Sequence, residues 1–568
     1  MGMTFKRPWL AHYPKSIPGR INIEEKALHM YLQEAAEDEP EKVALEFMGT
    51  EMTYEEVYHQ SLALCERLQS LGIEQGDRVA IMLPNCPQAV ISYYGTLMAG
   101  AVVVQTNPLY VERELENQIV DSGAKLIICL DMVYPRVMNI FGHTNLEHVI
   151  VTKVEEYLPF PKSMIYPLMK KRNHQMLVNT YHTDHTHSLN TLIKNGHPTQ
   201  VNSVSVDPKR DLALLQYTGG TTRSAKGCML THRNLVSNTA QALTWMYKID
   251  HGNEVILCAL PFFHVYGMTV GMNFSIMDRS KMVIVPRFER EQVLKTIQKQ
   301  KVSIFPGTPT MYIGIINDPH VHKYDLSSVN VSISGSAPLP FDVQMRFEQL
   351  TGGKLVEGYG LTEASPVSHF NLVWGYRPKG SIGLPWPNTD VKVISQETGE
   401  MVGPGEIGEI AICGPQIMRG YWRRREETRA SFQEEWLLTG DMGYMDEEGF
   451  FYIVDRKKDM IIAGGFNIYP REIEEVLFKH DDVQEVAVVG VPDLYRGETV
   501  KAFVVLKEGA TVNERELDIY CRKYLAAYKV PKMYEFREEL PKTTVGKVLK
   551  RELTNEKKPI VSREISND

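Results

Sequence analysis

The first two thirds of the chain alternate short apolar runs with segments of helical periodicity. Residues 126–130, 255–260 and 282–285 are runs of four to six consecutive apolar side chains. Such runs, too short for a helix and without polar alternation, are typical of strands covered on both faces. Strands separated by helices usually pair in parallel. We therefore predict an α/β fold with a large N-terminal domain of several subdomains, built on largely parallel sheets.

The pattern of apolar runs and turn residues changes twice toward the C-terminus. From about residue 380, glycine and proline separate short apolar runs, which predicts an antiparallel β unit. After a charged break that begins at Asp455, helical patterns at 470–480 and 514–525 flank two strand-like runs. This pattern predicts a small α+β domain. We place the N-terminal domain at residues 1–454 and the C-terminal domain at residues 455–568.

Charge and cysteine content exclude several classes of protein. The 568-residue chain has a net charge of −8, from 62 Lys and Arg against 70 Asp and Glu. Nucleic-acid binding needs clustered basic residues, so we expect no nucleic-acid partner. The seven cysteines form no CxxC pair, which argues against zinc and thioredoxin-type motifs. Isolated cysteines fit a reducing compartment, and we predict a cytoplasmic protein.

One long uncharged stretch, residues 79–111, could be mistaken for a membrane span. A spanning helix needs about 20 continuous apolar residues, whereas prolines and asparagines interrupt this stretch. We predict instead a strand at 78–83, a helix at 88–100 and a strand at 101–106.

Two further segments carry weaker signals. Residues 157–176 mix apolar and basic side chains, which fits either a solvated excursion or contact with an anionic membrane surface. We favour the solvated excursion and leave peripheral membrane contact open. Residues 181–187 contain three histidines, but a loop without an orienting second set of partners makes a poor metal site.

The segment most informative about chemistry is residues 214–227. A largely apolar strand leads into a loop dense in Gly, Thr and Ser that ends with Lys226. Glycines let backbone N–H groups approach an anion, while hydroxyls and a lysine add donors. The GxxxxGK pattern of a Walker A loop is absent. The predicted phosphate-binding residues are Thr218, Gly219, Gly220, Thr221, Thr222 and Lys226.

A GxGxxG match at residues 403–408 does not predict a dinucleotide site. That motif must follow a strand and open a helix, but the run after it, residues 409–413, has the pattern of a strand. We predict a turn between β-strands.

Three other glycine-containing loops carry residues suited to a nucleotide. Tyr359 could stack on a base, Thr362 could donate to phosphate, and Glu363 could hold Mg²⁺. Asp441 follows a glycine and suits ribose hydroxyls, and Lys547 ends a loop near the C-terminus. Each loop taken alone could also be an ordinary turn.

In this order and spacing the motifs resemble those of the adenylate-forming superfamily, which contains acyl-CoA synthetases, peptide-synthetase adenylation domains and firefly-type luciferases. The resemblance spans roughly residues 25–555. Within that group the chain is most similar to bacterial long-chain fatty-acid–CoA ligases. The resemblance implies that ATP and a carboxylate form an acyl-adenylate and pyrophosphate. A rotation of the small domain about Asp455 then lets the thiol of CoA attack the adenylate, and AMP leaves.

The resemblance also implies roles for individual residues. Residues 218–226 would close over the β- and γ-phosphates, and Thr362 would contact the α-phosphate. Glu363 would ligate Mg²⁺, and Lys547 would bridge the substrate carboxylate and the α-phosphate during adenylation. The implied catalytic residues are thus Lys547, Thr362, Glu363 and His264. The other implied nucleotide and CoA contacts are Gly335, Ser336, Ala337, Tyr359 and Gly360 around adenine, Asp441 and Arg456 on ribose, and Gly464 and Gly465 beside the pantetheine channel.

Substrate class is argued partly from the segment around His264. Amino-acid-activating relatives carry an Asp at this position, which would pair with an α-ammonium, so His264 argues against amino acids. Gly267 and Gly271 would share one face of a helix. They could make room for an alkyl chain or allow close helix packing, and the sequence leaves both readings open.

The chain departs from the superfamily's usual pattern in two loops. Arg223 stands where the phosphate loop usually has Gly, and Ala225 where it often has Pro. Arg223 would either strain the loop or add a phosphate contact. Val545 replaces a more usual Ser or Thr.

Our leading hypothesis is an ATP-dependent long-chain fatty-acid–CoA ligase that uses ATP, Mg²⁺ and coenzyme A. Alternatives are an aryl acid–CoA ligase or a fatty acyl-AMP ligase with another acceptor. A luciferase-like oxygenase and a non-catalytic nucleotide or acyl binder are less favoured. A homodimer remains open.

Overall fold

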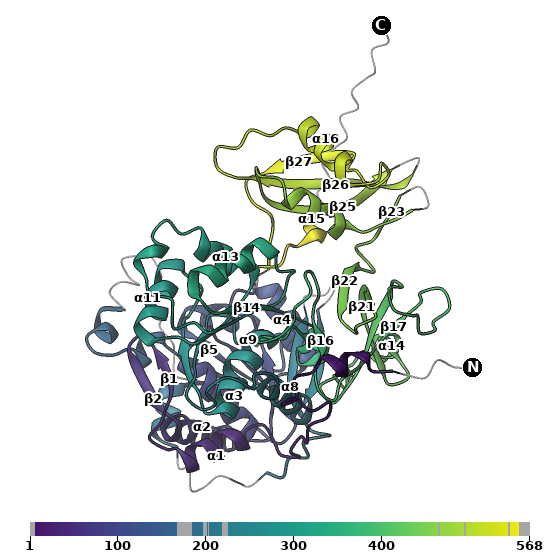
Figure 1. Cartoon of the computed structure of the whole chain (residues 1–568). Coiled ribbons are helices and arrows are strands. Elements are labelled where there is room, and N and C mark those ends of the chain that lie inside the picture. The colour runs from purple at the N-terminus through teal and green to yellow at the C-terminus, as the bar shows by residue number, and fades with distance from the viewer. Residues whose placement is uncertain are drawn as a thin grey trace. The chain divides into compact units, whose positions relative to one another are not determined.

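The computed structural model describes residues 6–166, 184–196, 202, 204–218, 225–463, 466–493, 496–543 and 546–555. The chain forms two compact units (Figure 1). Unit 1 comprises residues 1–391, 411–438 and 447–450, and unit 2 comprises residues 392–410, 439–446 and 451–568.

A nine-stranded sheet forms one half of the core of unit 1. Its strands from β14 to β1 pair in parallel, and antiparallel strands close both edges. The order is β16 (Leu384–Pro385), β15 (Val367–Phe370), β14 (Lys354–Gly360), β13 (Val331–Ser334), β12 (Ile304–Gly307), β10 (Val255–Cys258), β11 (Lys281–Ile284), β1 (Val43–Phe47), β2 (Thr50–Thr53).

An eight-stranded sheet forms the other half. It is parallel from β8 to β7, while β8 and β9 form an antiparallel hairpin to which β19 is added. The order is β19 (Gly420–Tyr421), β9 (Lys226–Thr231), β8 (Leu212–Thr218), β4 (Val102–Gln105), β3 (Arg78–Met82), β5 (Leu126–Leu130), β6 (His148–Thr152), β7 (Thr186–Ser188).

Helices cover these sheets. α3 is buried along its whole length, as expected for a helix with apolar residues on every side. Thr53 and Thr231 begin α2 and α8 with capping boxes, in which each side chain accepts from the backbone N–H three residues on. The helices of unit 1 are α1 (Met30–Asp38), α2 (Tyr54–Ser70), α3 (Pro87–Met98), α4 (Glu112–Ser122), α5 (Tyr134–Phe141), α7 (Leu189–Lys194), α8 (His232–Trp245), α9 (Val265–Gly267), α10 (Phe274–Asp278), α11 (Arg290–Gln300), α12 (Pro309–Ile316), α13 (Phe341–Thr351) and α14 (Arg425–Ala430).

A third, smaller sheet follows in the sequence. Its order is β17 (Asp390–Ile394), β18 (Gly408–Cys413), β21 (Trp436–Met445) and β20 (Phe432–Gln433), with β22 (Phe451–Arg456) paired to β21. β21 pairs antiparallel with both β20 and β22. The glycine-rich residues 403–408 lead into β18, so the GxGxxG match lies in a turn before a strand, as predicted.

The C-terminal part of unit 2 has its own hydrophobic core. Its sheet order is β24 (Phe466–Ile468), β23 (Ile461–Ala463), β26 (Gly497–Leu506) and β25 (Val483–Asp493), with β27 (Met533–Arg537) on β26. Helices α15 (Pro470–Phe478) and α16 (Glu514–Tyr524) pack against each other, and α17 (Lys550–Asn555) packs on β25. Ile473, Leu477, Val504 and Leu517 are among the fully buried residues of this core.

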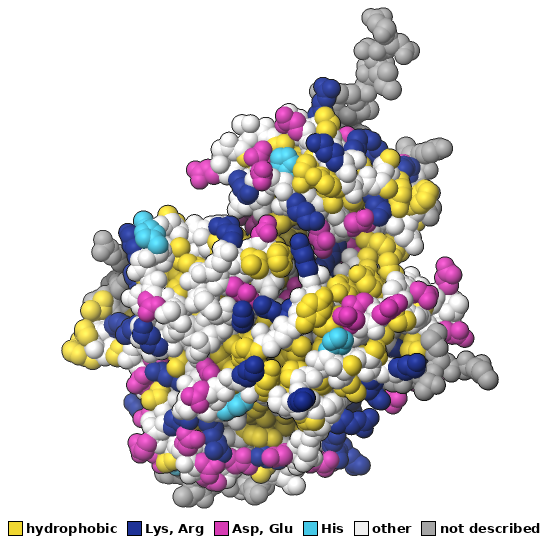
Figure 2. Space-filling model, in the orientation of Figure 1, with side chains coloured by type: hydrophobic (Ala, Val, Ile, Leu, Met, Phe, Trp, Pro, Cys, Tyr) yellow, Lys and Arg dark blue, Asp and Glu magenta, His cyan; other side chains and the backbone are white. Residues whose placement is uncertain are grey.

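The predicted fold class is confirmed. The stretch at 78–106 folds as the predicted strand, helix and strand, β3, α3 and β4. Within the described ranges, no helix is long and apolar enough to span a membrane. Charged side chains of both signs are interspersed over the visible face (Figure 2).

Candidate active site

The predicted phosphate loop connects the two strands of the β8–β9 hairpin. Thr218 and Lys226 pair with each other at its end, so both flank the loop directly. The base of the hairpin is fixed from the side, because the Tyr217 hydroxyl donates to Asp121 over 2.7 Å. Asp121 also accepts from Arg424 over 2.6 Å. Gly219, Gly220, Thr221, Thr222 and Arg223 lie outside the described residues.

A short 3₁₀ turn, Thr362–Ala364, follows β14 and presents Glu363. The Tyr421 hydroxyl donates to Glu363 Oε1 over 2.7 Å. The ammonium group of Lys226 lies 5.1 Å from the centre of the same tyrosine ring. The structure thus links the phosphate-loop lysine and the predicted Mg²⁺ ligand through one side chain, although they are far apart in sequence.

The predicted adenine-contacting residues lie at the carboxyl ends of two neighbouring parallel strands. Ser334 on β13 pairs with Glu357 on β14. Gly335 directly follows β13, whereas Tyr359 and Gly360 are the last residues of β14 and pair with β15. Tyr359 is half-buried and packs edge-on against His369, with ring centres 5.6 Å apart. Ligands of α/β sheets bind at this carboxyl edge.

Glycine is required at Gly360, and there is little room for a side chain at Gly335. A Cβ at Gly360 would lie 2.0 Å from the carbonyl oxygen of Pro366, and one at Gly335 would lie 3.0 Å from the ring of Tyr266. Ser336 has a φ of 70°, an uncommon conformation for a residue other than glycine. This backbone is held tightly beside the edge where a base would stack.

His264 follows β10 at the same edge. It is the N-cap of α9, which continues without a break through residues 268–273 into α10. Its Nδ1 accepts from the backbone N–H of Tyr266 over 3.2 Å. The loop before it is held by Asn85, whose amide donates to the carbonyls of Cys258 and Leu260 and accepts from Phe262 N–H. Asn85 is fully buried, so the approach to His264 is fixed by a side chain from the loop between β3 and α3.

The two glycines after His264 have different surroundings. A Cβ at Gly267 would lie 2.4 Å and 2.7 Å from two backbone carbonyl oxygens. At Gly271 the nearest atom would be Cys258 Sγ, at 3.3 Å. Gly267 therefore serves close packing, the second of the two readings. Residues 268–273 form a π-helical turn, which the sequence did not reveal.

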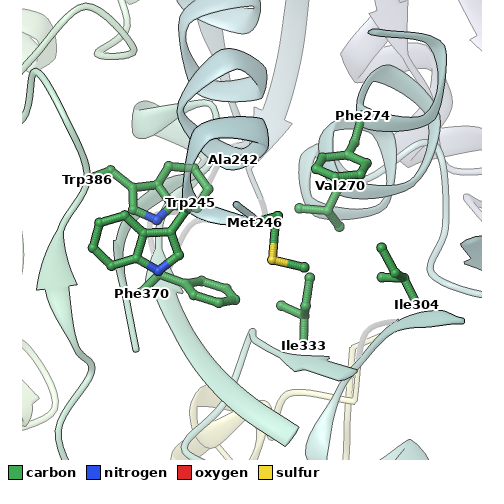
Figure 3. Close-up of a pocket in the computed structure, with 9 residues that line it drawn as sticks. All are labelled: Ala242, Trp245, Met246, Val270, Phe274, Ile304, Ile333, Phe370 and Trp386. Carbon is green, nitrogen blue, oxygen red and sulfur yellow. The ribbon is translucent and has the colours of Figure 1, made fainter. Parts of the chain in front are cut away.

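An apolar pocket lies beside this turn (Figure 3). Val270 and Phe274 point into it from the helix that His264 begins, and Ile304 and Ile333 point into it from β12 and β13. Every lining side chain is hydrophobic. The remaining lining residues are Ala242, Trp245, Met246, Phe370 and Trp386.

Unit 2 carries a second group of predicted residues. Asp441 and Arg456 pair across β21 and β22, and their side chains form an ion pair of 3.3 Å. Lys547 lies near them in a turn in which its N–H bonds Thr543 Oγ1 over 3.1 Å. Burial and then the positive charge of Arg456 lower the pKa of Lys547 to about 8, with Asp441 opposing. The structure thus brings Asp441, Arg456 and Lys547 together.

Asp455 is fixed within unit 2. Its carboxylate accepts from its neighbour Arg456 N–H over 2.6 Å and from Arg471 N–H, at the start of α15, over 2.8 Å. Burial raises the pKa of Asp455. Gly464 and Gly465 lie outside the described residues. The hinge and the boundary at residue 455 remain predictions.

The structure describes only parts of the two segments with weaker signals, residues 157–176 and 181–187. His148 and His187 approach to 3.2 Å between ring nitrogens. Across the portion of the chain with assigned positions, however, no group of three or more His, Cys, Asp or Glu residues could hold a metal. Residues 167–183, which include most of the basic stretch and His182, lie outside the described residues.

Sequence reasoning missed Tyr421 and Asn85. Both contact the predicted site only through pairing of distant elements. A tyrosine directly after Gly420 and an asparagine between two prolines carry no local pattern that points to these partners.

The largely parallel sheets of unit 1 and the smaller sheets that follow define an α/β protein. The model for the AMP-binding enzyme family matches residues 32–422, and that for the AMP-binding enzyme C-terminal domain matches residues 472–547. The chain belongs to the AMP-binding enzyme family, which confirms the resemblance to adenylate-forming enzymes.

Full-length relatives support this assignment. A long-chain-fatty-acid–CoA ligase of Bacillus subtilis (strain 168) is 51% identical over 554 residues, covering 98% of this chain and 99% of the relative. One from Salmonella typhimurium is 40% identical over 555 residues, covering 97% and 98%. The crystal structure of ATP-bound MatB from Rhodopseudomonas palustris has a TM-score of 0.81 at 30% identity, covering 93% of this chain and 98% of that one.

Proposed function

We propose that this protein is an ATP-dependent long-chain fatty-acid–CoA ligase that releases AMP and pyrophosphate. The observation that carries the choice of substrate is the whole-length similarity to long-chain-fatty-acid–CoA ligases. The hydrophobic lining of the pocket beside the helix that follows His264 suits an acyl chain, and its cavity of about 20 Å³ has to widen to hold one.

The first half-reaction needs a good leaving group, because a carboxylate is a poor electrophile. Residues 218–226 bind the β- and γ-phosphates, and Thr362 donates to the α-phosphate. Gly335, Ser336, Ala337, Tyr359 and Gly360 hold adenine, and Asp441 and Arg456 hold ribose. Because negative charge develops around the α-phosphate, positioned donors and cations supply most of the rate acceleration.

Glu363 suits a magnesium ion. Mg²⁺ in nucleotide sites is held by one or two carboxylates together with phosphates and waters. The half-buried carboxylate of Glu363, on the turn beside the phosphate-loop hairpin, fits that requirement without a larger acidic cluster. Mg²⁺ bound there would neutralise charge on the phosphates.

Lys547 supplies a cation to both the substrate carboxylate and the α-phosphate during adenylation. We propose that the C-terminal domain, residues 455–568, then rotates about Asp455 and carries Lys547 away from the reacting groups. We propose that Gly464 and Gly465, which have no side chains, would leave room for the thiol arm of CoA on its way to the adenylate.

A hydrophobic acyl site favours long chains. Each buried CH₂ contributes about 0.8 kcal/mol, so affinity rises with chain length as far as the widened pocket extends. His264 does not supply the carboxylate that an α-ammonium would need, which disfavours amino acids.

Simultaneous assays of pyrophosphate release and acyl-CoA formation test this function. Acetate, octanoate, palmitate, a coumarate-type acid and mixed amino acids are compared, each with and without CoA. Palmitate should give both products. Pyrophosphate without thioester would point to an acyl-AMP ligase with another acceptor, and preference for the coumarate-type acid would point to an aryl acid–CoA ligase.

The cytoplasmic location, a peripheral membrane contact and a homodimer belong to the same proposal. Phe160 and Met164 are 79% and 67% exposed, which supports contact with a lipid surface. Co-sedimentation with vesicles containing anionic lipid, compared with the double variant Phe160→Ser, Met164→Ser, tests the contact. Light scattering tests the dimer.

A further inference from the structure

We propose that Tyr421 is a positioning residue of the adenylation site, which orients the Glu363 carboxylate for its metal and steadies Lys226 beside the phosphates. This inference rests on the proposed function, because it takes Glu363 as the Mg²⁺ ligand and Lys226 as a phosphate contact.

The backbone around Tyr421 ties together the two segments that carry these groups. Tyr421 pairs with Cys228 on β9, and Trp422 N–H bonds the Gly227 carbonyl over 2.7 Å. On the other side, Met418 N–H bonds the carbonyl of Glu363 over 2.8 Å. The segment 418–422 therefore lies between the phosphate-loop hairpin and the Glu363 turn.

The tyrosine side chain makes a separate contact with each functional group. Its hydroxyl donates to Glu363 Oε1 over 2.7 Å, which fixes the rotation of the carboxylate. Its ring faces the Lys226 ammonium at 5.1 Å, within the range of a cation–π contact. A phenol is protonated at neutral pH, so the hydroxyl can donate to the carboxylate.

This arrangement has a chemical consequence for the metal. A carboxylate with one oxygen engaged by a phenol presents the other in a fixed direction. Partners that orient a ligand in this way typically change metal affinity 10- to 100-fold when they are removed. Tyr421 itself carries no negative charge and needs no contact with the nucleotide.

The test is Tyr421→Phe, which keeps the ring and removes the hydroxyl. Manganese binding is measured by electron paramagnetic resonance in the presence of α,β-methylene-ATP, which is not cleaved to pyrophosphate. We expect manganese affinity to fall about tenfold, while the Michaelis constant for palmitate is unchanged. Tyr31→Phe is the matched control, because Lys26 lies 4.1 Å from the centre of that ring and neither residue belongs to the predicted site.

A double-mutant cycle excludes a merely structural effect. In the Glu363→Gln background, Tyr421→Phe should cause no further loss of manganese affinity, because both changes act on one interaction. Tyr421→Leu, which also removes the ring, should weaken binding of the analogue without metal, through Lys226.

A folded Tyr421→Phe variant with wild-type manganese affinity overturns the inference, as does an additive loss in the Glu363→Gln background. If Tyr421→Phe does not fold, Tyr421→Leu, which also has no donor, replaces it, and wild-type manganese affinity in that variant is again contrary. A wild-type protein that binds manganese with the analogue but makes no acyl-CoA would contradict the proposed function alone.

Discussion

The candidate groups of unit 1 and those of unit 2 are held in opposite ways. In unit 1, Glu363 accepts from a phenol and Lys226 faces an aromatic ring. In unit 2, Lys547 is half-buried near Arg456, a second cation, and its pKa falls to about 8. In unit 1, the charges of Glu363 and Lys226 are stabilised by neighbouring side chains. In unit 2, the positive charge of Lys547 is stabilised only when an anion binds beside it.

This difference suits a fixed receptor and a movable catalytic group. A lysine whose charge is poorly stabilised without substrate is strongly attracted by the anionic phosphates of ATP and by the substrate carboxylate. This attraction is weaker once pyrophosphate has left. The predictions below test whether the two regions differ in this way.

The largest effect is expected for Lys547→Ala. Loss of the cation should slow adenylation from palmitate and ATP about a thousandfold. It should leave thioester formation from supplied palmitoyl-adenylate and CoA largely intact. Rapid-quench measurements of each half-reaction check this, and equal loss of both would show that Lys547 does not act in one conformation alone.

A comparable loss, but of stability, is expected for Gly267→Ala in unit 1. The new methyl group would meet two backbone carbonyl oxygens that cannot move independently. We expect the free energy of unfolding to fall by about 3 kcal/mol, measured by urea denaturation of unit 1. If the variant were as stable as wild type, unit 1 would be less rigid around His264 than we infer.

Alkaline pH should act through unit 2. Lys547 loses its charge as pH rises through about 8, because its pKa is lowered. We expect kcat/KM for adenylation to be level below pH 8 and to fall about tenfold per pH unit above it.

Lys547→Arg, whose side chain stays charged, should lose this alkaline limb even if its rate is lower overall. A limb that persists in the arginine variant would assign the titration to another group.

A smaller effect is expected for Asp455→Ala. The carboxylate accepts from the N–H at the start of α15, so its removal should destabilise unit 2 by about 1–2 kcal/mol. Hydrogen exchange of α15 checks this, with exchange of α8 as the internal control. If the backbone amides of α15 exchanged no faster than in wild type, the hydrogen bond from Asp455 would not stabilise the start of this helix.

Patterns of burial explain what the sequence could predict. The strand, helix and strand at 78–106 were predicted within a few residues because their apolar runs and prolines act locally. The phosphate-loop strand was predicted for the same reason. Tyr421 and Asn85 could not be found in this way, because each acts on a partner more than 50 residues away. The π-helical turn at 268–273 also has no sequence signature that separates it from an α-helix.

The smallest expected effect sharpens the contrast between two glycines on one helix. In Gly271→Ala the new methyl group would meet Cys258 Sγ at 3.3 Å, a contact that a small shift relieves. We expect less than about 1 kcal/mol of lost stability, against about 3 kcal/mol for Gly267→Ala. The neighbouring Val270 lines the apolar pocket, so the same shift should also lower the preference for palmitate over octanoate slightly. A large loss of stability at Gly271 would mean that the pocket wall is as rigid as the loop before His264, and that unit 1 has no adaptable surface for the acyl chain.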